Sequence, residues 1–298
     1  MSASRTLAGM ALAILALMCF AVLDTATQWM NLQYPVLMAL WFRYVFQAIA
    51  TTAVMMPVRG RALFHTRKLG LQMLRGALLL ITSLFTFLSL KYMPVGEFTA
   101  IAMITPLAVT LLAATWLKEP VSRVRWLLVA GGFAGSLIII RPGDVNFSWV
   151  MLLPLGMVGS YACFQILTSR MVKTEDAVTM HVYTGWAGTA LASLALPFVW
   201  TLPANTAQWG GLLLMGAMGT IGHFMLIQAF RRIPAATFSP LLYSQIGFAL
   251  LGGWLVFSHI PDPTAMAGIV MIAVCGAGAA WLALRENQRR FNLAPVEV

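Results

Sequence analysis

A few ionisable side chains stand inside long apolar stretches of this sequence, where they could bind a charged group or carry a proton. Asp24 and Arg43 flank Asn31–Tyr34, a segment short enough to be the turn between two helices. An ionised side chain at the centre of a bilayer costs about 3 kcal/mol on insertion scales, so each needs a partner or a function. We expect Asp24 and Arg43 either to form a static ion pair or to open into a site for a substrate or a proton.

Glu97 and His223 each allow two interpretations. Glu97 follows Pro94 by three residues, near the outer end of a predicted span. It is either an interfacial carboxylate that pairs with Lys91, or a gating or proton-carrying group. His223 lies in the middle of a span, and histidine changes charge near neutral pH. It is either a hydrogen-bonded neutral histidine or a proton carrier.

Polar residues share one face of two predicted helices, since residues about 3.6 positions apart recur on the same side of a helix. The face in the first apolar stretch is formed by Phe20, Asp24, Thr27 and Gln28, and the matching face 141 positions later by Tyr161, Gln165 and Thr168. We expect the two faces to be opposite walls of a substrate site. The alternative is interhelical hydrogen bonding, which polar residues in membrane spans commonly provide.

The segment Leu90–Leu107 recurs 140 positions later as Ala229–Ile246, and each copy carries a proline inside a predicted helix. Pro106 and Pro240 each lack a backbone donor and free the carbonyl four residues earlier. In a membrane such a break is tolerated where protein or a watery cavity satisfies the freed group. Matching interruptions in two halves of a chain therefore predict a binding site.

Tyr243 and Gln245 follow the second proline and are candidates for contact with a substrate. Two positions along a helix differ by about 200° in direction, so the two side chains cannot both face one site unless the break rotates the segment. Tyr243 is the favoured member of the pair, with structural packing as the alternative to a substrate contact.

These residues must be positioned by membrane-spanning helices. The chain has 298 residues, of which 60% are hydrophobic and only 9% are charged, a composition that no water-soluble fold explains. Ten apolar stretches have about the length that crosses a bilayer. They are Leu7–Met30, Pro35–Met56, Leu71–Leu90, Pro94–Leu117, Val124–Ile140, Val150–Arg170, Ala177–Thr201, Gln208–Phe230, Ala235–Ser258 and Thr264–Leu284.

The basic residues predict the orientation of these spans. With the N-terminus inside, sixteen of the 19 Lys and Arg residues fall on the inner side and two on the outer side. Positive charge accumulates in cytoplasmic loops, so both termini are expected in the cytoplasm. The net charge of +10 follows from these loops and does not indicate a nucleic-acid partner.

The repeat and the span count together predict an all-α integral membrane protein with two inverted halves. Five spans per half is an odd number, so the second half must enter the membrane upside down relative to the first. The expected organisation is one five-helix repeat at 5–142, a second at 148–285 and a cytoplasmic tail at 286–298.

The segments Leu90–Leu107 and Trp116–Gly143, and their counterparts Gly222–Gln245 and Ile260–Trp281, resemble the two repeats of EamA-type transporters in the drug/metabolite transporter superfamily. The resemblance implies ten helices, a cavity between the halves and secondary transport of a small metabolite. Within the superfamily the chain is similar to the bacterial carriers of S-adenosylmethionine. Gln28 stands where that likeness would place a lysine.

Other functions lack a motif in this sequence. It has no P-loop, dinucleotide fingerprint, nucleophile elbow or zinc-protease motif, so we expect no enzyme activity, cofactor or metal. The predicted function is secondary transport, across a bacterial inner membrane, of a small polar organic metabolite that is amino-acid-like or nucleoside-like. The alternatives are uptake of a vitamin or an S-adenosylmethionine-like cofactor, a non-transporting scaffold, or an intramembrane enzyme. Neither the substrate nor the direction of transport follows from the sequence.

The expected partners are the lipid bilayer and the small-molecule substrate, with the chain as a monomer or weak homodimer. Gly131 and Gly135 form a G-x-x-x-G pattern, which lets helices approach closely in lipid. We expect it to pack the fifth span against the tenth, with a dimer interface as the alternative.

Overall fold

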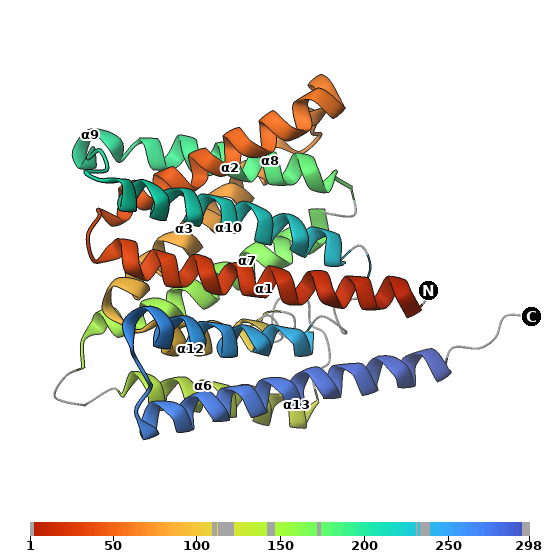
Figure 1. Cartoon of the computed structure of the whole chain (residues 1–298). Coiled ribbons are helices and arrows are strands. Elements are labelled where there is room, and N and C mark those ends of the chain that lie inside the picture. Colours follow the sequence, from red (N-terminus) through yellow and green to blue (C-terminus); the bar gives the residue numbers. More distant parts are fainter. Residues whose placement is uncertain are drawn as a thin grey trace, which may run out of the picture.

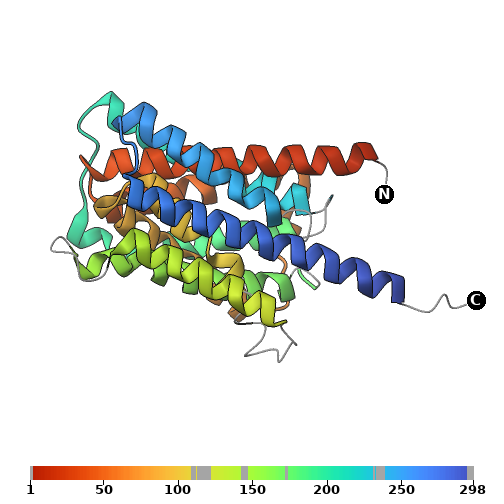
Figure 2. The ribbon, with the colours of Figure 1, turned by 90° about the horizontal axis from the view of Figure 1, so that it is seen from below.

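The computed structural model describes residues 3–108, 112, 122–141, 147–171, 174–230, 232 and 239–293, and these residues form helices and connecting segments without any strand. The long helices run roughly side by side, and α1 begins at the same end of the bundle at which α13 ends (Figure 1; Figure 2). We call this the terminal end and the other the opposite end.

The described part of the first half contains five α-helices and one short 3₁₀ helix. They are α1 (Ala3–Asn31), α2 (Val36–Arg59), η1 (Gly60–Phe64), α3 (Leu69–Tyr92), α4 (Val95–Ala102) and α6 (Arg123–Ile140). Arg141 follows α6 in the left-handed conformation, with φ of 52°.

The second half begins at the 3₁₀ helix η2 (Trp149–Leu152). It continues with α7 (Leu153–Met171), α8 (Ala177–Ser193), α9 (Leu196–Val199), α10 (Thr206–Phe230), η3 (Ser239–Tyr243), α12 (Ser244–Phe257) and α13 (Pro263–Leu293). The expected tail at 286–298 therefore starts inside α13, which continues to Leu293.

Five helical stretches among the described residues are long and apolar enough to cross a membrane. They are Leu7–Asn31, Val36–Phe64, Leu69–Tyr92, Trp149–Thr168 and Thr206–Leu226, and they correspond to the first, second, third, sixth and eighth predicted spans. Four shorter apolar helices follow at Val95–Ala108, Trp126–Ile140, Leu241–Phe257 and Pro263–Ala279. The chain is thus an all-helical, multi-pass membrane protein.

The helices pack in a definite set of pairs. Helix α1 lies against α10 and α12, while α7 lies against α3 and α4. Helix α2 contacts α8 and α10, and α8 also contacts α3. Helices α4 and α12 form a pair, as do α6 and α13, which lie side by side along one edge of the bundle in both views (Figure 1; Figure 2).

The pair α6 and α13 is held at close range by the glycines singled out in the sequence. A Cβ added to Gly131 would lie 2.6 Å from Cys275 Sγ, and one added to Gly135 would lie 2.9 Å from Ile272 Cγ1. The G-x-x-x-G pattern therefore packs against the tenth predicted span, as expected. Helix α13 of the same chain covers this face of α6, so the face is not accessible to a second copy of the protein.

The helix that contains Pro106 is interrupted just before that proline. Helix α4 ends at Ala102, and helical structure resumes at Thr105 after a two-residue turn. The Thr105 hydroxyl donates to the carbonyl oxygen of Ala102 at 2.6 Å, which satisfies the group that the proline frees. In the second half Pro240 lies in η3, where the chain is 3₁₀ before it becomes α-helical at Ser244. Ala236 lies outside the described residues.

Candidate functional site

Polar and charged side chains from six helices meet inside the bundle. We call Asp24, Arg43, Arg75, His181, His223 and Gln245 the central polar cluster. They come from α1, α2, α3, α8, α10 and α12, and all are buried except His223, which is partly buried. Buried ionisable groups in membrane spans are rare and usually face the interior of a bundle or a pathway.

Arg43 is held from one side by helix α3. Its Nη1 donates to Ser83 Oγ at 2.9 Å, and the Tyr44 hydroxyl lies 2.9 Å from the same oxygen. The guanidinium carbon also lies 5.0 Å from the centroid of the Tyr44 ring, within the range of a cation–π contact. These contacts fix the direction of the Arg43 guanidinium, while its Nε has no hydrogen-bond partner among the described residues.

Asp24 does not pair directly with Arg43. Among the described residues no carboxylate oxygen lies within 4.0 Å of the Arg43 guanidinium, so the expected static ion pair is absent in this conformation. Asp24 Oδ2 instead accepts a hydrogen bond from Gln245 Nε2 at 3.4 Å. This contact joins α1 in the first half to α12 in the second.

The preference for Tyr243 over Gln245 is reversed in the structure. The Tyr243 ring packs on α13, where a Cβ added to Gly276 would lie only 1.8 Å from the tyrosine oxygen. Its hydroxyl is buried with no hydrogen-bond partner among the described residues. Gln245 is therefore the member of the pair that faces the central polar cluster.

Arg75, one of the sixteen basic residues counted on the inner side, lies in the interior of the bundle. Its Nε donates to Thr168 Oγ1 at 2.8 Å, and its Nη1 donates to the Met180 carbonyl at 2.9 Å and to Thr184 Oγ1. Its guanidinium lies 4.7 Å from the centroid of the Phe164 ring. Arg75 therefore ties α3 to α7 and α8.

The two histidines of the cluster lie near each other, with ring centroids 6.2 Å apart. His223 Nδ1 is 2.8 Å from the carbonyl oxygen of Gly219, and since a carbonyl can only accept, this nitrogen carries the hydrogen. His181 Nδ1 is 3.4 Å from Gln47 Nε2, while its Nε2 is buried without a partner among the described residues. His223 is thus hydrogen-bonded, as one of its two interpretations requires.

The Gln28 side chain binds backbone groups at the start of α4. Its Oε1 accepts from the backbone N–H of Val95 at 3.1 Å, and its Nε2 donates to the Met93 carbonyl at 3.5 Å. The side chain therefore satisfies an otherwise unpaired donor at the start of α4, as a capping group does. Both ends of the amide are occupied, which argues against the expected substrate contact.

On the matching face of α7, Tyr161 stacks on Phe164 with ring centroids 5.7 Å apart. Arg75 lies over Phe164, so this aromatic pair adjoins the central polar cluster. Gln165 is partly buried, and the structure records no hydrogen bond for its side chain among the described residues. Thr168, the third member of this face, accepts from Arg75.

Glu97 is buried at the opposite end, where α4 begins. Its Oε1 lies 2.9 Å from Nε2 of His259, which follows α12. Lys91, the expected partner, lies instead over the Tyr92 ring at 5.8 Å. The expectation of a Glu97–Lys91 pair is therefore wrong, and the contact that forms joins α4 to the segment after α12.

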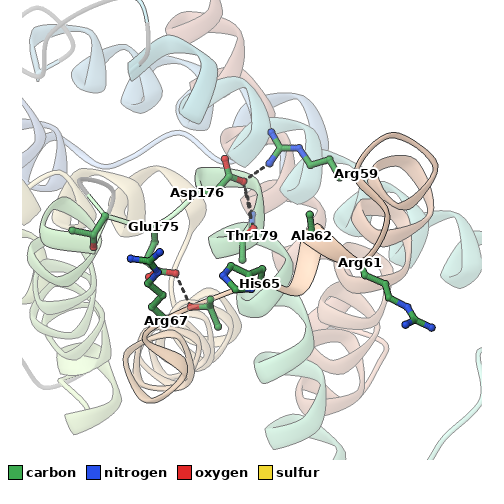
Figure 3. Close-up of a pocket in the computed structure, with 10 residues that line it drawn as sticks. Arg59, Arg61, Ala62, His65, Arg67, Glu175, Asp176 and Thr179 are labelled. Atoms are coloured by element: carbon green, nitrogen blue, oxygen red, sulfur yellow. Dashed lines mark hydrogen bonds and ion pairs between the residues drawn. The ribbon is translucent and has the colours of Figure 1, made fainter.

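The terminal end carries a pocket of about 560 Å³ between the η1 segment and the α7–α8 linker. Figure 3 shows Arg59 reaching Asp176, while Arg61 points away from the other side chains. The Thr66 hydroxyl donates to Glu175 Oε2 at 2.6 Å and holds the pKa of that carboxyl below its ordinary value. These contacts fasten α2 and the segment between η1 and α3 to the start of α8.

Asp176 also caps helix α8. Its Oδ1 accepts from the backbone N–H groups of Val178 at 3.0 Å and Thr179 at 3.1 Å. Burial alone would raise the pKa of Asp176, but the Thr179 N–H, the Arg59 guanidinium and the Val178 N–H together hold it below its ordinary value. Asp176 is thus stabilised as a carboxylate at neutral pH.

Several residues of the site were not singled out from the sequence. Ser83 follows Thr82 in an apolar stretch, whereas His181 and Thr184 are three positions apart and share one helical face, a signal that could have found them. The signal that could have found Arg75 is its distance from the loop, since it stands six residues after the start of α3.

The chain is therefore a multi-pass membrane protein with a buried, charged interior, which is the character of a membrane transport protein. Residues 7–141 and 148–281 each match the EamA-like transporter family. The chain belongs to this family, as its resemblance indicated.

Three curated relatives cover most of the chain. It is 25% identical over 281 residues to a riboflavin transporter of Vibrio cholerae, covering 93% of this chain and 94% of that protein. It is 24% identical over 269 residues to an S-adenosylmethionine uptake transporter of Rickettsia felis, covering 89% and 90%. It is 28% identical over 274 residues to a pseudopaline exporter of Pseudomonas aeruginosa, covering 89% and 93%.

A protein of known crystal structure has the same fold. It superposes with a TM-score of 0.65, covering 96% of this chain and 99% of that one at 19% identity.

Proposed function

We propose that this protein is a secondary transporter that moves a small polar organic metabolite across a bacterial inner membrane by alternating access. The observation that carries the proposal is the convergence of Asp24, Arg43, Arg75, His181 and Gln245 from both halves of the chain inside an apolar bundle. Such groups are costly in lipid and mark substrate or ion pathways.

The packing of the helices supports two inverted halves, at 5–142 and 148–285. The exchange of the two halves replaces α1 by α7, α3 by α10 and α4 by α12, and the reverse. Under this exchange the contact of α1 with α10 becomes the contact of α7 with α3. The contact of α1 with α12 likewise becomes the contact of α7 with α4. The pairs α2–α8, α4–α12 and α6–α13 map onto themselves under the same exchange. This is the pattern that a two-fold axis in the membrane plane would produce, and it supports ten spans in all.

Contacts at the two ends supply candidate gates. At the opposite end, Glu97 and His259 join α4 to the segment after α12. At the terminal end, Glu175 and Asp176 join the α7–α8 linker to the segment after η1 and to α2. In the proposed cycle the contacts at one end of the bundle break while those at the other end remain formed. The central polar cluster thereby becomes accessible from each side of the membrane in turn. The excess of basic residues in the loops at the terminal end supports a cytoplasmic location for that end.

The relatives support a small organic substrate and leave its direction of movement open. One is named for uptake and another for export, as expected for a symmetric carrier that follows its gradients. The proposed substrate is amino-acid-like or nucleoside-like, with a vitamin or an S-adenosylmethionine-like cofactor as the second candidate. The riboflavin and S-adenosylmethionine relatives favour that second candidate.

Flux from liposomes that contain only this protein tests the proposal. The liposomes are loaded with a defined mixture of amino acids, nucleosides and water-soluble vitamins, and efflux is followed by mass spectrometry against protein-free liposomes. Transport predicts faster release of at least one compound in unchanged chemical form. A compound that is converted into a product inside the liposomes would instead favour an intramembrane enzyme, and equal release of every compound would favour a scaffold.

A further inference from the structure

We propose that the substrate carries an anionic group, a carboxylate or a phosphate, and that the Nε–Nη2 edge of Arg43 binds it. This inference rests on the proposed transport function and names the chemistry of its substrate.

The charges buried in the interior do not balance. Among the described residues the buried charged side chains are Asp24, Arg43, Arg75 and Glu97. Glu97 lies at the opposite end, where it contacts His259. Two guanidinium groups therefore share the interior with one carboxylate. An uncompensated buried cation is unfavourable, so an anion that enters this interior is stabilised there.

The two arginines differ in which of their N–H donors are already used in hydrogen bonds. Arg75 uses both Nε and Nη1 in hydrogen bonds to α7 and α8, so it is committed to holding helices together. Arg43 donates from Nη1 to Ser83 and also has a hydrogen-bond contact with the Tyr44 hydroxyl, and among the described residues its guanidinium has no further hydrogen bond. Its Nε is buried and has no partner among the described residues. The free edge of Arg43 is the pair of parallel donors that binds carboxylate and phosphate in a bidentate manner.

This edge of Arg43 faces a glycine. A Cβ added to Gly219 of α10 would lie 3.2 Å from Arg43 Nε and 3.8 Å from Nη2. Any larger residue at position 219 would therefore place a carbon where an anion's oxygen atoms would sit. On α2, Gln47 follows Arg43 by one helical turn and points to His181, whose Nε2 is also without a partner among the described residues.

The same geometry disfavours a purely cationic substrate. Asp24 is the carboxylate in this part of the interior, and its Oδ2 already accepts from Gln245. A cation bound there would lie near two guanidinium groups, and like charges in a medium of low dielectric constant repel strongly. A zwitterion remains compatible, because its anionic group can contact Arg43 while its cationic group contacts Asp24.

The test compares matched compounds that differ in charge. The purified full-length protein is titrated with nicotinate and nicotinamide, phenylalanine and phenylalaninamide, and thymidine monophosphate and thymidine, and binding is read from the rise in melting temperature. The first member of each pair carries the anionic group. We expect stabilisation by the anionic member of at least one pair and little by its neutral or cationic partner, with the phosphate pair distinguishing phosphate from carboxylate recognition.

Two variants address the edge itself. Gly219→Ala adds a methyl group beside the edge and keeps the arginine, while Gly210→Ala on the same helix has nothing within 4 Å of its added Cβ and is the control. Arg43→Lys keeps the positive charge and removes the pair of parallel N–H donors. Loss of a charge-assisted hydrogen bond corresponds to roughly a 10- to 150-fold weaker affinity for the anionic member. We expect that loss in Gly219→Ala and Arg43→Lys, and unchanged affinity in Gly210→Ala.

The inference is overturned if neutral or cationic members bind as well as their anionic partners, or if Gly219→Ala and Arg43→Lys retain the preference for anions. Efflux of the same compounds from liposomes separates this failure from that of the proposed function. Release of neutral compounds by the wild-type protein would refute the anion site and leave transport standing. Anion binding without release of any bound compound would refute transport instead.

Discussion

Replacement of Gly188 by alanine should destabilise the protein and disturb a site that the residue does not touch. Gly188 lies on α8, and a Cβ added there would lie 2.2 Å from Cδ1 and 2.4 Å from Cε1 of Tyr44 on α2. Tyr44 is 0% exposed, so its ring has no open space to move into. The ring must shift, and with it the hydroxyl that shares Ser83 with Arg43.

The expected magnitude combines three contributions. Alanine is favoured over glycine inside a helix by about 1 kcal/mol. Overpacking a dense interior costs about 1–3 kcal/mol, and loss of the Tyr44–Ser83 hydrogen bond costs about 0.6 kcal/mol, the average for such bonds in a membrane protein. The net expectation is a loss of about 1–2 kcal/mol in the free energy of unfolding, taking the middle of the overpacking range.

Reversible unfolding in mixed detergent micelles measures this difference. Gly247→Ala on α12 is the matched control, because nothing lies within 4 Å of its added Cβ, and it should be neutral or slightly stabilising. Tyr44→Phe isolates the hydrogen-bond contribution. If Gly188→Ala is as stable as Gly247→Ala, then α2 and α8 do not pack at this distance and the reasoning fails.

Three further predictions concern other parts of the chain. Pro106→Ala should impair flux more than it lowers the melting temperature. The reason is that the proline interrupts a helix, and the Thr105 hydroxyl already binds the carbonyl that the proline frees. Wild-type flux in this variant would contradict the role of the broken helix in transport. Asp176→Ala should cost about 1 kcal/mol of unfolding free energy at pH 7 through loss of the α8 cap. The folded-state pKa of Asp176 is lowered, so its ionised form stabilises the fold above about pH 4, and that stabilisation disappears as the pH falls through the lowered pKa. The difference in unfolding free energy between the variant and the wild type should therefore shrink in acid. A difference that does not depend on pH would contradict the assignment. Cysteines placed in the Pro57–Gly70 segment should react with an impermeant thiol reagent only from the cytoplasm, and labelling in intact cells would refute the orientation.

The sequence was sufficient to predict the class of fold and the family. Long apolar stretches and a repeat at 140 positions are features of the chain itself, and they do not depend on how side chains meet. The same is true of the glycines in α6, since small residues at helical spacing predict close packing whatever the partner.

The contacts of individual polar residues were not predictable in the same way. Gln28 shares a helical face with Asp24, but a periodic pattern cannot show that its amide reaches the start of α4. The partner of Glu97 was sought among nearby residues, whereas His259 is 162 positions away and is brought close only by the pairing of α4 with α12. Arg75 falls inside the predicted span Leu71–Leu90 but is counted with the inner-side basic residues, because charge statistics count residues and do not locate them in depth.

The central claim is that the central polar cluster is a transport site, and the most direct test is flux through a double variant, Asp24→Asn with Arg43→Gln. The compounds to be followed are those that raise the melting temperature of the wild-type protein. Removing one negative and one positive charge leaves the net charge of the interior unchanged, so the double variant should insert and fold with a melting temperature near that of the wild type. The account predicts that this folded protein releases the compounds no faster than protein-free liposomes. Wild-type flux through the folded double variant would contradict it.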